Sequence, residues 1–119
     1  MHILLAEDHR DLHLAVRQFL ERAGATVESA YDGRQAVEIL RREEFDALII
    51  DVYLPVLDGP KVISQARSEL GLANLPIIAV SAGGEAARAA ALEAGANIFI
   101  DKPMRLRQVM DTIQRLLAT

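Results

Sequence analysis

Cysteine and tryptophan are both absent from the 119 residues of this chain. The lack of cysteine excludes disulfides, thiolate metal sites and cysteine nucleophiles, and it fits a reducing compartment. Aromatic residues make up only 4% of the chain and hydrophobic residues 51%, so the core must be aliphatic. A chain of this length buries roughly two-thirds of its unfolded surface, which is enough for a core without cross-links. We therefore expect residues 1–119 to form a single domain.

The sequence also lacks an excess of positive charge and any long apolar run. Its net charge of -4 argues against a nucleic-acid-binding surface, because the phosphate backbone requires clustered Lys and Arg. No apolar run approaches the ~20 residues of a membrane-spanning helix. No basic stretch with an apolar segment and a cleavage site follows Met1. We expect a cytoplasmic protein that neither inserts into membranes nor binds nucleic acid directly.

Short apolar runs alternate with longer segments of helical period along the whole chain. The runs, which we predict to be strands, are Ile3–Ala6, Thr26–Ala30, Ala47–Ile50, Ile77–Val80 and Ile98–Ile100. Most are almost continuously apolar, as is typical of parallel strands covered on both faces. Right-handed crossovers then place helices on both sides of the sheet. The pattern predicts an α/β fold of (βα)5 type, with a doubly wound, parallel five-stranded sheet.

Spacing and end signals predict details of the helices. One helical face of the first helix is predicted to carry Leu12, Ala15, Val16, Phe19 and Ala23. Gly24 is a suitable residue to end this helix, and Asp32 is a suitable N-cap for the second. The third helix is predicted to bury Val62, Ile63, Ala66 and Leu70 and to stop at Gly71.

Polar residues follow four of the five predicted strands directly. Glu7 and Asp8 follow the first strand, Asp51 the third, Ser81 the fourth and Lys102, after Asp101, the fifth. In an open parallel sheet, ligands bind outside the carboxyl ends of the strands, where the strand order reverses. A flavodoxin-like order, 2-1-3-4-5, would make the first and third strands neighbours. The acids would then share one crevice with Ser81 and Lys102 on its rim.

Clustered carboxylates require a counter-charge. Each residue alone is typical of a loop cap or a solvated charge, but their joint position at one sheet edge favours a site. Two like charges ~4 Å apart repel by about 4 kcal/mol at an effective dielectric near 20, so the acids must raise their pKa values or bind a cation. Three negative charges and one Lys leave -2, which one divalent ion neutralises. Oxygen ligands favour Mg²⁺, or Mn²⁺ in its place.

The motifs at these strand ends resemble a known family. "AED", "IIDVYLPVLDG", "VSA" and "DKP" occur in the order and at the strand ends of the response-regulator receiver domain of bacterial two-component signalling, of the chemotaxis-receiver type. The resemblance covers essentially the whole chain and implies the flavodoxin-like strand order. It also implies a phosphoprotein rather than an enzyme acting on separate substrates. The phosphoryl donor would be a histidine kinase or a histidine phosphotransfer domain.

The resemblance assigns roles to the acidic residues. Asp51 would be the phosphoacceptor and would form an aspartyl phosphate. Asp8, Asp51 and the backbone carbonyl of Tyr53 would bind Mg²⁺ directly, and Glu7 would act through water. A carboxylate nucleophile gives a labile acyl phosphate, which suits a reversible signal.

The resemblance also assigns switch and structural roles. Ser81 would bond one phosphoryl oxygen and Lys102 another, and Phe99 would be the rotating aromatic residue, although ordinary packing of its strand explains it equally well. The switched surface would comprise the fourth helix, fifth strand and fifth helix. Three residues shape the loops: Pro55 stiffens the segment after the acceptor, Gly59 begins the third helix after the Asp58 turn, and Pro103 follows a cis bond.

Other interpretations explain the sequence less well. His9 and His13 have helical metal spacing but lack further ligands, so we expect a solvated first turn. An aspartyl phosphatase needs a second acid at the position of Tyr53, and a flavodoxin-like cofactor site would not carry the acidic "EDHRD". A degenerate receiver that acts only as an interaction module stays open. So does the choice between a stand-alone regulator and a receiver attached to a larger protein, with a downstream partner or an attached domain as output.

Overall fold

The computed structural model describes residues 1–118 and contains five strands and five helices in strict alternation. The strands are β1 (His2–Ala6), β2 (Thr26–Ala30), β3 (Ala47–Asp51), β4 (Ile77–Ser81) and β5 (Ile98–Asp101). The helices are α1 (Arg10–Arg22), α2 (Gly33–Arg42), α3 (Gly59–Arg67), α4 (Gly84–Ala94) and α5 (Leu106–Leu117). The predicted strands agree with these bounds to within one residue at each end.

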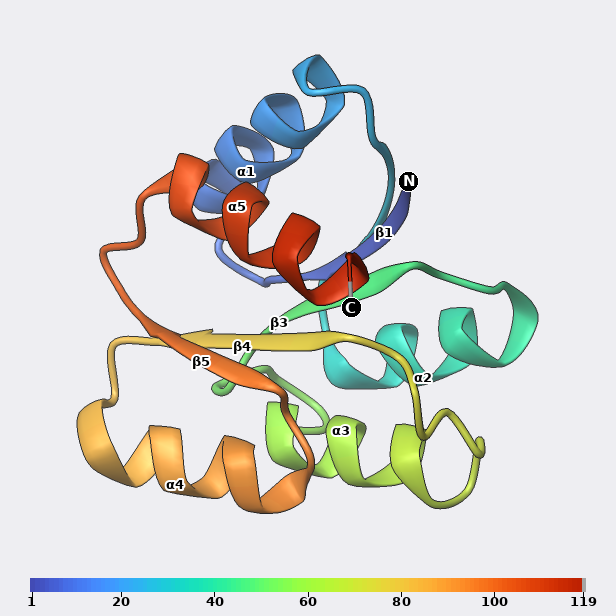
Figure 1. Cartoon of the computed structure of the whole chain (residues 1–119). Helices are drawn as coiled ribbons and strands as arrows, with labels where there is room; N and C mark the ends of the chain where they lie inside the picture. Colours follow the sequence, from blue (N-terminus) through green and yellow to red (C-terminus); the bar gives the residue numbers. More distant parts are fainter. Residues whose placement is uncertain (119) are drawn as a thin grey trace.

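All neighbouring strands are parallel, in the order β2-β1-β3-β4-β5. Helices α1 and α5 cover one face of the sheet, and α2, α3 and α4 cover the other (Figure 1). The predicted fold class and strand order are therefore confirmed. Among residues 1–118, no helix is both long enough and apolar enough to cross a bilayer.

Two aliphatic layers fill the space between the sheet and its helices. Alternate strand residues serve opposite faces: Ile3 and Leu5 pack toward α1 and α5, whereas Leu4 and Ala6 pack toward α2, α3 and α4. Since β3 and β4 are buried along their full length, apolar residues occupy both of their faces. The buried strands form an aliphatic platform whose carboxyl ends carry the polar residues.

The predicted face of α1 was partly wrong. The buried residues of this helix are His13, Val16 and Leu20, while Ala15 and Ala23 are exposed. The helix is rotated relative to the prediction because a polar residue, His13, lies inside, where tertiary partners bond its ring. A solvated environment for His13 is therefore also wrong, whereas His9 is exposed and its ring accepts a hydrogen bond from the Leu12 amide.

The remaining helix signals are mostly confirmed. Asp32 caps α2 by accepting a hydrogen bond from the Gln35 amide, and Gly24 follows α1 with a positive φ of 99°. Helix α3 ends at Arg67, before the predicted stop at Gly71, and the Arg67 side chain donates to the carbonyls of Leu72 and Leu75 in the loop that follows. The chain between Arg67 and β4 is an irregular connection.

Candidate phosphoacceptor and metal site

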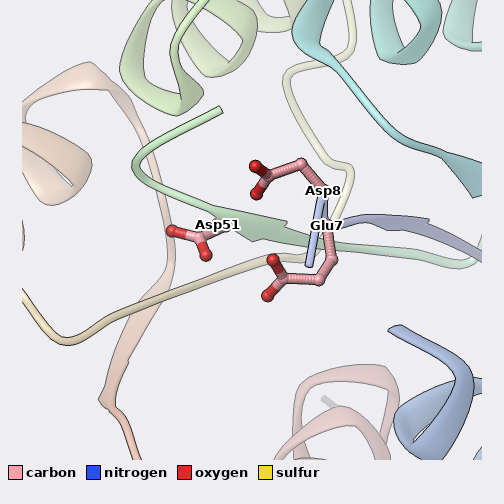
Figure 2. A group of neighbouring side chains, drawn as sticks. All are labelled: Glu7, Asp8 and Asp51. Carbon is pink, nitrogen blue, oxygen red and sulfur yellow. The ribbon is translucent and has the colours of Figure 1, made fainter. Parts of the chain in front are cut away.

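Three carboxylates meet at the carboxyl ends of β1 and β3. The register pairs Ala6 with Ile50, so Glu7 and Asp51 follow side by side on neighbouring strands. Glu7 and Asp51 are buried, with 2% and 5% of their surfaces exposed, and Asp8 is exposed. Each residue offers one oxygen, and these oxygens lie within 4.8 Å of one another. Figure 2 shows the three side chains grouped at the ends of the two strands. The predicted acidic cluster is therefore present.

Lys102 bridges the two buried acids from the end of β5. Its Nζ lies 2.8 Å from Glu7 Oε1 and 2.5 Å from Asp51 Oδ2. The remaining carboxylate oxygens accept backbone hydrogen bonds: Glu7 Oε2 from the His9 amide and Asp51 Oδ1 from the Tyr53 amide. The acids are thus held in fixed directions, and one ammonium balances part of their charge.

Burial and charge shift the pKa values of this group. Burial raises the pKa of Glu7, the Asp51 charge raises it further, and the bonds from Lys102 and the His9 amide partly oppose the rise. For Lys102, burial acts to lower the pKa, but the bonds to Asp51 and Glu7 outweigh it, so the pKa is raised. Lys102 offsets only part of the negative charge of Glu7, Asp8 and Asp51, and the charge that remains favours binding of a further cation.

An open cleft of about 920 Å³ leads to these acids. Its lining residues are Glu7, Asp8, His9, Arg10, Leu12, Asp51, Ala82, Lys102, Pro103 and Met104. A groove of about 1130 Å³ lies elsewhere, between the end of α2 and the loop before β4, and contains none of the predicted site residues. Asp51 forms part of the lining of this cleft, although only 5% of its surface is exposed.

The predicted switch residues lie near this cleft but not in it. Ser81 is completely buried at the end of β4, and its Oγ accepts a hydrogen bond from the Gly83 amide. Phe99 is buried in the layer beneath α3 and α4. Tyr53 is 60% exposed, and its ring lies against Gly83, where an added Cβ would be 2.5 Å from the phenol oxygen. The loop that carries Ser81 therefore contacts the loop after Asp51.

Three local features near Asp51 correspond to the sequence expectations: the Asp58 cap, the close approach at Gly59 and the bond before Pro103. Asp58 caps α3 by accepting a hydrogen bond from the Lys61 amide. At Gly59 an added Cβ would be 2.4 Å from the Asp51 carbonyl oxygen, so only glycine lets the start of α3 approach the strand end. The Lys102–Pro103 bond is cis. Val56, after Pro55, has a φ of 71°, an unusual conformation for a β-branched residue that no sequence signal predicted.

A second polar cluster, behind the acids, was missed by the sequence analysis. The His13 ring lies 2.8 Å from the Glu7 carbonyl oxygen and 2.8 Å from Ser29 Oγ. It stacks on Tyr31, and Arg17 donates to the same Ser29 oxygen at 2.6 Å. Burial, with the charges of nearby arginines, lowers the pKa of His13. A histidine on a helix gives no sequence signal for such partners, because they come from other strands.

Comparisons with known proteins agree with the fold and identify the family. The family model for the response regulator receiver domain matches residues 3–114. The response regulator MprA of Mycobacterium leprae is 38% identical over 118 residues, which are 98% of this chain and 51% of that protein. The chain therefore spans about half the length of the curated relatives it matches.

Solved structures with the same fold include receiver domains of sensor kinases. The receiver domain of sensor histidine kinase PA1611 from Pseudomonas aeruginosa has a TM-score of 0.93 and 32% identity. The match covers 99% of this chain and 98% of that domain's chain. That domain holds a magnesium ion in its active-site cleft. The receiver domain of a histidine kinase from Syntrophus aciditrophicus has a TM-score of 0.90 and 29% identity. The match covers 98% of this chain and 89% of that domain's chain. Family model, relatives and fold agree: the chain belongs to the response-regulator receiver domain family.

Proposed function

We propose that residues 1–119 form one receiver domain whose Asp51 accepts a phosphoryl group from a phosphohistidine, in a reaction that needs Mg²⁺. The observation that carries the proposal is the bridge from Lys102 to Asp51 and Glu7 at the mouth of the cleft. A structural ion pair needs no access from solvent and no neighbouring third acid, and this site has both. The donor is a histidine kinase or a histidine phosphotransfer domain.

The residues around Asp51 suit this reaction. A carboxylate oxygen of Asp51 attacks the phosphorus; the P–O bond forms, the P–N bond breaks, and the leaving imidazole keeps the electron pair and takes a proton from solvent. Charge accumulates on the equatorial phosphoryl oxygens. The Lys102 ammonium neutralises one of these oxygens after releasing Asp51 Oδ2. Ser81 donates its hydroxyl proton to another, because its oxygen only accepts from the Gly83 amide, a bond that leaves the O–H free.

The acidic cluster fits a divalent cation. Three carboxylates offer oxygens within 4.8 Å, one of the three residues is exposed to water, and Lys102 leaves two negative charges uncompensated. Mg²⁺, or Mn²⁺ in its place, prefers such oxygen ligands and keeps several waters. Asp8, Asp51 and the Tyr53 carbonyl would hold it directly, and Glu7 would hold it through water. When bound, the cation supplies positive charge to the transferring oxygens.

Phosphorylation then changes the surface formed by α4, β5 and α5. The movement of Ser81 pulls the loop before α4 inward, and Phe99 rotates into the space that this loop leaves. The buried position of Phe99 next to α4 supports this coupling. The altered surface acts on a downstream protein partner or an attached domain, without direct contact between this domain and nucleic acid.

A mass measurement tests the assignment of Asp51. The protein is incubated with acetyl phosphate and Mg²⁺, and its intact mass is compared with that of the Asp51→Asn variant. We expect a phosphoryl adduct on the wild-type chain only, and its loss when EDTA is present from the start. An equal adduct on the variant would remove Asp51 from its role. No adduct on either chain would indicate a degenerate receiver that acts as an interaction module.

A further inference from the structure

His13 is a buried polar residue that the proposed phosphoryl transfer does not use. Only 2% of its surface is exposed, although it stands on α1, a helix whose opposite face is in water. Both ring nitrogens have partners, the Glu7 carbonyl oxygen and Ser29 Oγ. The ring therefore joins α1 to the end of β1 and to β2, directly behind the acidic cluster.

The partners of the ring determine its tautomer. The Glu7 carbonyl oxygen can only accept a hydrogen bond, so the proton of the neutral ring must be on Nδ1. Nε2 then accepts from the Ser29 hydroxyl, which is free to donate because the same oxygen accepts from Arg17. Every donor in this chain of bonds has one acceptor, and the direction of each bond is fixed.

The bond from His13 acts on the peptide group that joins two of the site acids. The Glu7 carbonyl and the Asp8 amide belong to one planar unit, so a donor that holds this carbonyl fixes the plane between the two α-carbons. The other side of Glu7 is held by its own amide, which donates to the Ala30 carbonyl at 3.1 Å. Because the side chains leave from these α-carbons, the directions of both carboxylates depend on the plane.

We propose that His13 is a positioning residue: its Nδ1–H holds the Glu7–Asp8 peptide plane so that both carboxylates face Asp51. The inference rests on the proposed metal site, since the value of this arrangement is a preformed set of oxygen ligands. Partners behind the ligands of a metal commonly change its affinity by about 10–100-fold when they are mutated. The Ser29 side of the ring, by contrast, serves to hold the ring in place.

Two substitutions separate the two sides of the ring. The amide nitrogen of asparagine is as many bonds from Cα as Nδ1, so His13→Asn keeps a donor for the Glu7 carbonyl. The amide of glutamine reaches as far as Nε2, so His13→Gln keeps the partner of Ser29 and loses the donor to Glu7. Both variants remove a buried ring and its stack on Tyr31. Their loss of stability should therefore be similar, and Ser29→Ala is the control on the far side.

Isothermal titration of Mg²⁺ into the four proteins tests the proposal. We expect the Kd of His13→Asn and Ser29→Ala to stay within about threefold of wild type, and that of His13→Gln to rise about tenfold or more. Thermal unfolding without metal checks that each variant is folded at the titration temperature. If His13→Asn and His13→Gln bind Mg²⁺ with the same affinity, the positioning role is overturned. This holds whether that affinity equals the wild-type affinity or is weaker.

A metal-free measurement keeps this test separate from the proposed function. Long-range ¹H–¹⁵N correlation of the wild-type ring should show the proton on Nδ1 at neutral pH; a proton on Nε2 would overturn the proposal. The amide signals of Asp8 and His9 should move in His13→Gln and much less in His13→Asn, and the opposite order would also overturn it. If wild type binds no Mg²⁺, the metal site fails, and these signals still decide whether His13 positions the acids.

Discussion

At the scale of single residues, Lys102 forms ion pairs with both Glu7 and Asp51. Less than a fifth of each of these three side chains is exposed to water. Buried acids without a cation are unfavourable because the low dielectric penalises each charge. The burial that raises the pKa of Glu7 is opposed by its bond from Lys102. Removal of the Lys102 ammonium should therefore lower the stability of the folded state strongly.

We predict that Lys102→Met lowers the free energy of unfolding at pH 7 by about 3 kcal/mol, because two buried carboxylates lose their counter-charge. The loss should become smaller at pH 5, because the raised pKa of Glu7 favours its uptake of a proton as the pH falls. Urea unfolding at both pH values measures the effect. The exposed Lys61, changed to Met, is the control and should alter stability little. A Lys102→Met variant as stable as wild type at pH 7 would contradict the prediction.

His13 makes the stability depend on pH in a defined direction. Burial and the charges of Arg17 and Arg10 lower its pKa from the ordinary 6.5, against the bond to the Glu7 carbonyl. In the folded protein the His13 ring therefore stays neutral at pH values at which the same ring in the unfolded chain binds a proton. The contribution of His13 is complete above pH 6.5 and is lost as the pH falls through the folded-state pKa.

We predict that wild type loses stability faster than His13→Asn as the pH falls below 6.5, by at most about 1.4 kcal/mol per pH unit. Glu7 acts in the opposite direction, because its raised pKa lets the folded state hold a proton, but it does so in both proteins. Denaturant unfolding at a series of pH values gives the difference. Parallel pH profiles for the two proteins would contradict the lowered pKa.

At the scale of elements, Arg67 connects three segments. From the end of α3 its guanidinium donates to the carbonyls of Leu72 and Leu75, at 2.7 and 2.6 Å, and to that of Gly95 after α4. It also bonds Asn97, whose side-chain oxygen accepts from the Ile77 amide at the start of β4. These bonds satisfy carbonyls of irregular backbone that no helix or strand pairs.

We predict that Arg67→Met lowers the free energy of unfolding by about 3 kcal/mol, since several partly buried carbonyls lose a charged donor. Amide hydrogen exchange should accelerate in residues 72–75 and 95–97 more than in β1 or β3. Arg88→Met on the exposed face of α4 is the matched control and should change stability by less than about 0.5 kcal/mol. Uniform acceleration across the sheet would show that Arg67 does not act as a local connection.

At the scale of the whole molecule, the sheet brings together charges that are up to 95 residues apart in the chain. Glu7, Asp51 and Lys102 come from different strands, and the platform beneath them is aliphatic and buried. A ligand that binds this edge binds only the folded state, because the unfolded chain has no such cluster. Binding and folding are therefore linked.

We predict that Mg²⁺ at a hundred times its Kd raises the free energy of unfolding by about 2.7 kcal/mol. The measurement is urea unfolding with MgCl₂, compared with NaCl of equal ionic strength to remove general screening. The Asp51→Asn variant should respond less than wild type. Equal stabilisation by NaCl, or an undiminished response of Asp51→Asn, would contradict specific binding at this cluster.

The sequence by itself determined the alternation of strands and helices and the polar residues at the strand ends. These features follow from period and composition, because burial on both faces selects continuous apolar strands such as Ala47–Ile50 and leaves Asp51 at the end. The strand order and the site roles were available only through the resemblance to receiver domains. Neither the sequence pattern nor the resemblance predicted the early end of α3 at Arg67.

Only the tertiary structure decided which polar side chains lie inside. His13 is buried because Ser29, 16 residues away, and the Glu7 carbonyl satisfy its ring, and Arg67 ends α3 while bonding Gly95, 28 residues away. A polar side chain enters the core when its hydrogen bonds are complete, and the partners come from elements that are distant in sequence. The spacing of hydrophobic residues along the sequence shows which residues avoid water. Whether a polar side chain can be buried depends instead on hydrogen-bond partners that only the fold brings near.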